Sequence, residues 1–185
     1  MVEEIFEDLE ERMGKSVEAL KREYSRLRTG RASISLLDGI RVSYYDTPTP
    51  LNQMASLAVP EPRLIVVQPW DKTALEDIEK AILKSELGLT PMNDGKVIRI
   101  SIPPLTEERR KELVKVVKKI VEDAKVSIRN HRRTVNEQLK KLKNDKELSE
   151  DEYFKRHDEI QKITDDHVDQ CDTISSDKEK EILEF

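Results

Sequence analysis

The stretch from Thr106 to Asn144 constrains the fold most, because it contains neither Gly nor Pro. It follows Pro103 and Pro104, and Thr106 can serve as an N-cap with Glu107 in the first turn, where the helix dipole favours acids. Apolar or small residues recur in steps of three, four or seven, at Leu113, Val117, Ile120, Ala124, Ile128, Val135, Leu139 and Leu142. This spacing predicts a single helix, roughly 58 Å long at about 1.5 Å per residue, with a narrow buried stripe.

The predicted helix is strongly basic. Residues 106–144 carry 13 bases and 6 acids, a net charge of +7, whereas residues 145–185 carry 6 bases and 15 acids, a net charge of −9. The asymmetry favours a polyanion such as nucleic acid as the partner of one surface. Pairing of the basic helix with the acidic segment explains the same charges. We interpret one lysine row as a solvated face that steers association: Lys115, Lys118, Lys119 and Lys125.

Two further segments have the apolar spacing of helices. Residues 2–28 place one stripe on Ile5, Leu9, Met13, Val17, Leu20, Tyr24 and Leu27. After a cap and acids at 148–152, a second stripe follows on Tyr153, Ile160, Ile163, His167, Cys171, Ile174 and Ile182. Three helices with matched seams predict an elongated bundle of near-parallel helices.

The segment between the first two helices changes character. Short β candidates occupy residues 40–44, 54–59, 63–67 and 97–102, and a helix is predicted over 73–87, with Leu75, Ile78, Ile82 and Leu83 inward and a stop at Gly88. Thr47–Pro50 and Asn93–Gly95 are interpreted as punctuation and a turn, and Trp70 as a locally packed residue. The fold class is therefore α+β, with a small β/α/β domain inserted into the bundle.

The insertion predicts two domains joined by a double linker. The bundle comprises residues 1–29 and 106–185, and the inserted domain comprises residues 30–105. Gly30 makes the outgoing strand compliant, whereas Pro103 and Pro104 stiffen the returning strand, which favours a hinge about one axis. The predicted hinge residues are Thr29, Gly30, Arg31, Ala32, Ser33, Ile102, Pro103, Pro104 and Leu105.

Composition and missing motifs narrow the class of protein. The chain is 36% hydrophobic and 38% charged, too apolar for disorder and too charged for one large core. The lone Cys171, the acidic N-terminus and the lack of long apolar runs predict a soluble cytoplasmic protein with no membrane partner. Without a phosphate loop, a nucleophile elbow or metal-ligand spacing, we predict no catalytic residues, metal or cofactor. We therefore predict a protein that binds a partner rather than an enzyme. The alternatives are a helical scaffold or chaperone-like clamp and, more remotely, a hydrolase.

Several local strings resemble the bacterial ribosome recycling factor family in order along the chain. They are Leu27–Ser33, Leu36–Asp38 with Ile40, Tyr44–Tyr45, Thr47–Leu51, Leu87–Leu89, Pro103–Lys111, Arg129–Arg133 and Glu179–Phe185. The resemblance implies an L-shaped molecule, a three-helix bundle bearing a small domain on a hinge. It also implies a monomer that binds the large ribosomal subunit and its 23S rRNA. With elongation factor G and GTP, such a protein splits post-termination ribosomes and releases mRNA and deacylated tRNA. It catalyses no covalent step itself.

The candidate RNA contacts form two groups. Arg129 and Arg132 lie one turn apart with Arg133 beside them, so their guanidinium groups can grip adjacent phosphates. The second group, at the predicted elbow, is Arg28, Arg31, Arg109 and Arg110. Without the resemblance, the bases at the end of the first helix favour a solvated turn that complements the helix dipole over a phosphate site. Residues 168–176 are more acidic and polar than the family pattern, which predicts looser packing and no RNA contact there.

Overall fold

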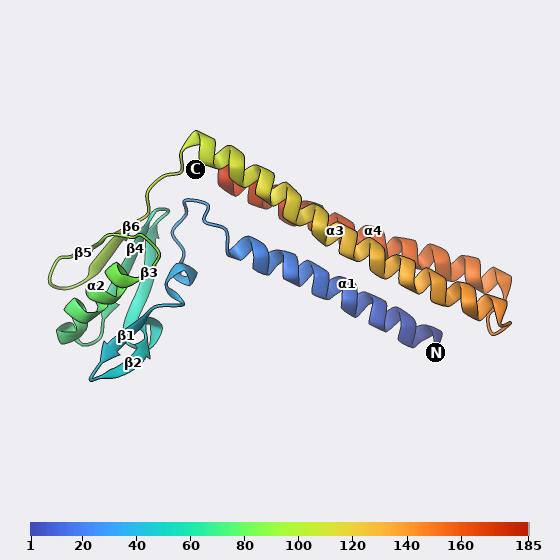
Figure 1. Cartoon of the computed structure of the whole chain (residues 1–185), viewed down its shortest axis with the longest axis horizontal. Coiled ribbons are helices and arrows are strands. Elements are labelled where there is room, and N and C mark those ends of the chain that lie inside the picture. Colours follow the sequence, from blue (N-terminus) through green and yellow to red (C-terminus); the bar gives the residue numbers. More distant parts are fainter. Residues whose placement is uncertain (185) are drawn as a thin grey trace. The chain divides into compact units, whose positions relative to one another are not determined.

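The computed structural model describes residues 1–184 and divides into two compact units (Figure 1). Met1–Thr29 and Glu107–Glu184 form the helical unit, and Gly30–Thr106 form the second unit. Phe185, which ends both the predicted bundle and the terminal family string, lies outside the described residues. Within residues 1–184, every helix is too short or too polar to cross a lipid bilayer.

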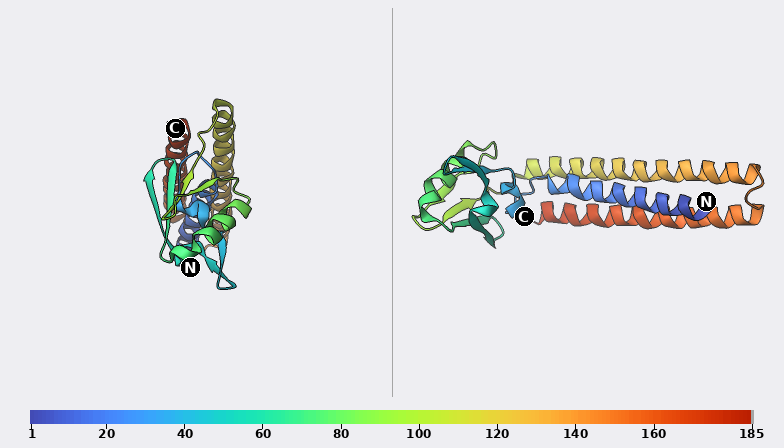
Figure 2. Two further views of the ribbon diagram at one scale, coloured as in Figure 1. Left: turned by 90° about the vertical axis from the view of Figure 1, so that its left-hand side faces the viewer. Right: turned by 90° about the horizontal axis from the view of Figure 1, so that it is seen from below.

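The helical unit packs α1 (Val2–Ser25), α3 (Glu107–Asn144) and α4 (Glu150–Leu183) against one another. α1 and α4 run in the same direction and α3 runs opposite to them, as both views of the ribbon show (Figures 1 and 2). The seam is largely apolar: Leu9, Met13, Val117, Ile128, Leu139, Ile160, Cys171 and Ile182 are all fully buried. The predicted three-helix bundle is confirmed.

The ends of the long helices follow from local chemistry. The Ser149 side chain accepts a hydrogen bond from the Glu152 amide, and the Glu152 carboxylate accepts one from the Ser149 amide. This reciprocal box satisfies two otherwise free donors at the start of α4. α1 begins beside the second turn of α4, where Glu3 pairs with Arg156 at 2.9 Å. The α3–α4 hairpin therefore continues past the start of α1 as a pair of helices (Figure 2).

The second unit has a four-stranded antiparallel sheet in the order β3-β4-β6-β5. Its strands are β3 (Ala55–Glu61), β4 (Leu64–Pro69), β6 (Ile98–Ser101) and β5 (Pro91–Asn93). A separate hairpin pairs β1 (Arg41–Tyr44) with β2 (Thr47–Pro50), and α2 (Leu75–Lys84) completes the core. The register sets Ile65 opposite Ile100, and both side chains are fully buried. The predicted α+β class is confirmed.

The small unit differs from the sequence prediction in several elements. Thr47–Pro50 is a strand rather than punctuation, because its prolines lie on an edge strand paired only with β1. The strand Pro91–Asn93 was not predicted at all. α2 begins only after a 3₁₀ turn at Lys72–Ala74 and ends at Lys84, four residues before Gly88. α1 likewise ends at Ser25 rather than at Arg28.

Some predicted core positions are also wrong. Leu83 is 57% exposed and Trp70 is 69% exposed, so neither is packed as predicted. In the bundle, Val121 joins the buried stripe of α3. Residues 168–176 are not loosely packed at the seam, since Cys171 is fully buried and Ser175 is only 7% exposed. Small polar residues there fit a narrow interface that larger apolar side chains would overfill.

Candidate nucleic-acid interface

The predicted arginine cluster lies on one flank of α3. Arg133 is exposed, and no other residue within 1–184 forms an ion pair or hydrogen bond with its guanidinium. Arg129 Nη1 lies 3.1 Å from Glu122 Oε1 on the same helix, in a solvated pair of the kind that salt readily screens. Arg132 is half-buried and donates a long hydrogen bond of 3.4 Å to Gln161 Oε1 on α4. The cluster therefore retains much of its positive charge.

The acidic α4 neutralises other bases of α3 more fully. Lys125 is only 17% exposed and pairs with Asp172 across the helix interface. This contact removes Lys125 from the solvated lysine row predicted from the sequence. Near the far end of the hairpin, Lys143 lies 4.7 Å from the centre of the Tyr153 ring, a cation–π contact. The expected pairing of basic and acidic helices thus occurs at particular positions rather than along the whole interface.

The second predicted group of arginines is divided between the two units. Arg28, Arg109 and Arg110 belong to the helical unit, and Arg31 belongs to the second unit. Arg109 pairs with Glu112 at 3.0 Å on the exposed first turns of α3. Arg110 donates to the carbonyl oxygen of Leu183 at 3.2 Å, so it satisfies an acceptor at the end of α4. Arg110 therefore has a structural role at the end of α4, and its RNA contact stays a prediction.

The linker residues are tied to the two units at defined points. On the helical side, the buried Thr29 hydroxyl donates to Glu181 Oε1 at 2.9 Å. On the other side, the Ala32 amide donates to the Pro62 carbonyl at 2.7 Å, and the Ile102 amide donates to the Arg63 carbonyl at 2.8 Å. Both strands of the linker are thus held by the turn that joins β3 to β4.

The other residues of the predicted hinge lie between or beside these hydrogen-bonded positions. Gly30 has a φ of +80°, and a Cβ added to it would lie 3.1 Å from Leu105 Cγ. Such a φ strongly favours glycine. Ser33 caps the 3₁₀ turn Ile34–Leu37, which fixes it within the second unit. The short segments between the hydrogen-bonded positions therefore consist of Gly30 and Arg31 on one strand and residues 103–106 on the other.

A polar cluster that the sequence did not predict lies between α1 and α3. The Ser16 and Ser127 hydroxyls are 3.1 Å apart, and His131 Nε2 lies 3.4 Å from Ser16 Oγ. Burial lowers the pKa of His131; Arg12 lowers it further, and Asp8 opposes the shift. Ser16 is more than 100 residues from Ser127 and His131 in the sequence, so the three side chains meet only because α1 packs against α3.

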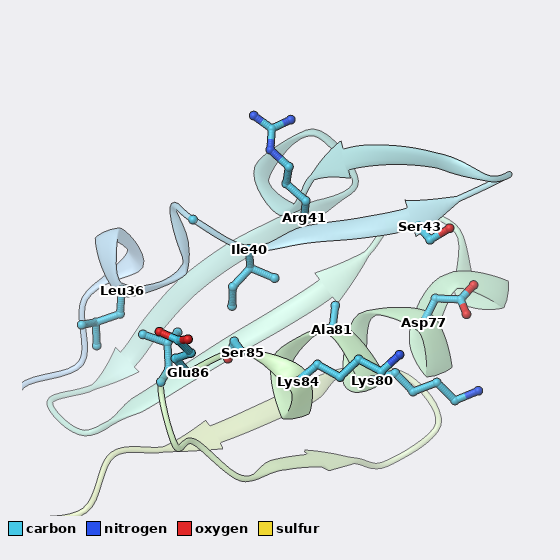
Figure 3. Close-up of a pocket in the computed structure, with 12 residues that line it drawn as sticks. Leu36, Ile40, Arg41, Ser43, Asp77, Lys80, Ala81, Lys84, Ser85 and Glu86 are labelled. Atoms are coloured by element: carbon cyan, nitrogen blue, oxygen red, sulfur yellow. The ribbon is translucent and has the colours of Figure 1, made fainter.

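The second unit contains a groove between α2 and β1, with a volume of about 630 Å³ (Figure 3). Leu36, Ile40 and Ala81 supply apolar lining, while Lys80 and Lys84 extend along the α2 side. The lining contains neither histidine nor cysteine. Its charged lining residues are Arg41, Asp77, Lys80, Lys84 and Glu86.

Fold and charge together define an α+β protein in which a basic long helix, α3, packs against an acidic helix, α4, in one unit, and a small antiparallel sheet with one α-helix forms the other. A family model described as "Ribosome recycling factor" matches residues 20–183. The chain belongs to the ribosome recycling factor family, whose members are non-enzymatic translation factors. The resemblance seen in the sequence is confirmed.

Curated relatives match over nearly their whole length. The ribosome-recycling factor of Syntrophobacter fumaroxidans is 60% identical over 185 residues and is covered completely, as is this chain. That of Nitratidesulfovibrio vulgaris is 61% identical over 184 residues, covering 100% of this chain and 99% of the relative.

Solved structures agree with the fold. A solution structure of the ribosome recycling factor gives a TM-score of 0.77 at 44% identity, covering 100% of this chain and 98% of that chain. A second match, with a TM-score of 0.65, 48% identity and 99% coverage of both chains, comes from models of the T. thermophilus ribosome recycling factor and the E. coli elongation factor G bound to the E. coli post-termination complex.

Proposed function

We propose that this chain binds the 23S rRNA of the large ribosomal subunit through the arginine flank of α3, defined as Arg129, Arg132 and Arg133. With elongation factor G and GTP, it splits the post-termination ribosome, so that mRNA and deacylated tRNA leave. It acts as a monomer in the cytoplasm, and GTP is hydrolysed on elongation factor G. Membership of the family and the solved complex that contains elongation factor G support this proposal.

One observation supports the RNA contact most directly. Twelve of the 34 residues of α4 are acidic, yet within residues 1–184 neither Arg132 nor Arg133 forms an ion pair. A guanidinium without a carboxylate partner can give its full charge and a fork of N–H donors to a phosphate. A helical scaffold that used the bundle seam for protein binding would have no use for such a flank.

The contact is tested by the salt dependence of binding to purified large subunits. Arg133→Ala should weaken binding and reduce the log–log salt slope by roughly 0.7 to 0.9, because one phosphate contact no longer releases a counterion. Arg22→Ala is the matched control, since Arg22 is an exposed base on α1. If affinity and slope both equal those of the unchanged protein, the flank does not bind RNA.

We further propose that the hinge is shorter than the predicted set of residues. Thr29 is bonded to the end of α4, whereas Ala32 and Ile102 are bonded to the β3–β4 turn of the second unit. Movement between the units is then confined to Gly30, Arg31 and the stretch 103–106.

A further inference from the structure

Two bases of α3, seven residues apart on the same helical flank, meet α4 in different ways. Lys125 is paired with a carboxylate, that of Asp172. Arg132, two turns later, is met by the neutral amide of Gln161. Although α4 is rich in acids, Arg132 faces a neutral amide. The charge of Lys125 is therefore neutralised within the protein, whereas the charge of Arg132 remains available.

The amide of Gln161 is held in a single orientation. Its Nε2 donates to Asp165 Oδ1, one turn further along α4, at 2.8 Å. Because the nitrogen is committed to that carboxylate, the oxygen is the atom that faces Arg132 Nη1. Asp165 thus orients the amide, and the amide stands between the carboxylate and the guanidinium.

We propose that Gln161 is a positioning residue for rRNA binding: it holds the Arg132 guanidinium at the surface of the α3–α4 pair without neutralising it. This inference rests on the proposed contact between Arg132 and rRNA. Arginine has five N–H donors in a planar fork, and one long bond to an amide leaves the others for a phosphate. A carboxylate at the same place would compete with the phosphate for the same fork.

The test replaces the amide by a carboxylate of nearly the same shape. Gln161→Glu should weaken binding to purified large subunits by roughly threefold to tenfold and reduce the log–log salt slope by roughly 0.7 to 0.9. Its melting temperature serves as the folding control, because the new carboxylate can pair with Arg132 but loses the hydrogen bond to Asp165 and repels that carboxylate. Gln170→Glu, which adds the same charge at an exposed site on the same helix, should bind like the unchanged protein.

Two companion variants make the outcomes distinct. Arg132→Ala should weaken binding, and Gln161→Glu should add no further loss in that background. If Arg132→Ala binds normally, the proposed contact itself is wrong, and the positioning role falls with it. If Arg132→Ala binds weakly but Gln161→Glu binds normally, or if Gln170→Glu is equally impaired, only the positioning role is overturned.

A third variant keeps the proposal testable if Gln161→Glu fails to fold. Gln161→Leu removes the acceptor but leaves the charge of Arg132 intact. Affinity should fall severalfold while the salt slope stays that of the unchanged protein, because the number of available charges is the same. Unchanged affinity in a folded Gln161→Leu protein would overturn the positioning role.

Discussion

The bond between Thr29 and Glu181 predicts a measurable share of the stability of the helical unit. Thr29 is 4% exposed, and its hydroxyl donates to a carboxylate oxygen at 2.9 Å. Thr29→Val keeps the shape of the side chain and removes the donor. A hydrogen bond to a charged group contributes about 1.5–3 kcal/mol.

The expected loss is smaller than that range. The Glu181 side chain is 31% exposed and also lies 3.3 Å from Lys178 Nζ, so water and the lysine replace part of the lost bond. We expect the free energy of unfolding to fall by about 1 kcal/mol, which corresponds to a melting temperature lower by about 2–4 °C in a chain of this size.

Denaturant titration followed by far-ultraviolet circular dichroism measures the loss. Thr29→Ser retains the hydroxyl and is the control for changes in packing. A double-mutant cycle with Glu181→Gln isolates the pair, and a coupling of at least about 0.5 kcal/mol is expected for residues in contact. If Thr29→Val unfolds at the same denaturant concentration as the unchanged protein, or if the two substitutions are simply additive, the bond does not anchor the linker.

Two further predictions concern pH and the hinge. Because burial lowers the pKa of His131, the unfolded chain takes up the proton first, so the free energy of unfolding should fall as the pH drops below about 6.5. Denaturant titrations at pH 7.5 and 5.5 should show a smaller loss for His131→Asn than for the unchanged protein or a His157→Asn control; an equal loss contradicts the assignment. Gly30→Ala should strain the linker by about 1 kcal/mol and slow subunit splitting while binding persists. Gly88→Ala, at a φ of +66° with open space around it, is the control, and equal splitting rates for the two variants would contradict the hinge.

The long helices were predictable because their signal is local and repeated. The period of Leu113, Val117, Ile128 and Leu139 is set by the helix itself, and each of these residues is buried in the structure. The start of α4 was predictable for the same reason, since a capping box requires only Ser149 and Glu152. Neither inference needed knowledge of the rest of the chain.

The errors lie where packing between distant segments decides the outcome. Thr47–Pro50 becomes a strand because β1 offers it a partner, and its own propensity gives no sign of this. Trp70 is exposed, although its place beside Pro69 just before the helix favoured local packing. Gln161 could have been noticed as the neighbour of the buried Ile160, yet its pairing with Arg132 depends on the register of α3 against α4, which spacing alone does not fix.

The acidic α4 offsets the charge of the basic α3 in the bundle. Thirteen bases along α3 repel one another, and without nearby acids that repulsion would oppose folding of so thin a core. Pairs such as Lys125 with Asp172 relieve it where the helices meet. If every base were relieved in this way, the flank would have little charge left for phosphate. The neutral contact of Arg132 with Gln161 contributes less to the stability of the bundle than an ion pair that relieved this repulsion. It leaves the positive charge of Arg132 at the position proposed to meet RNA.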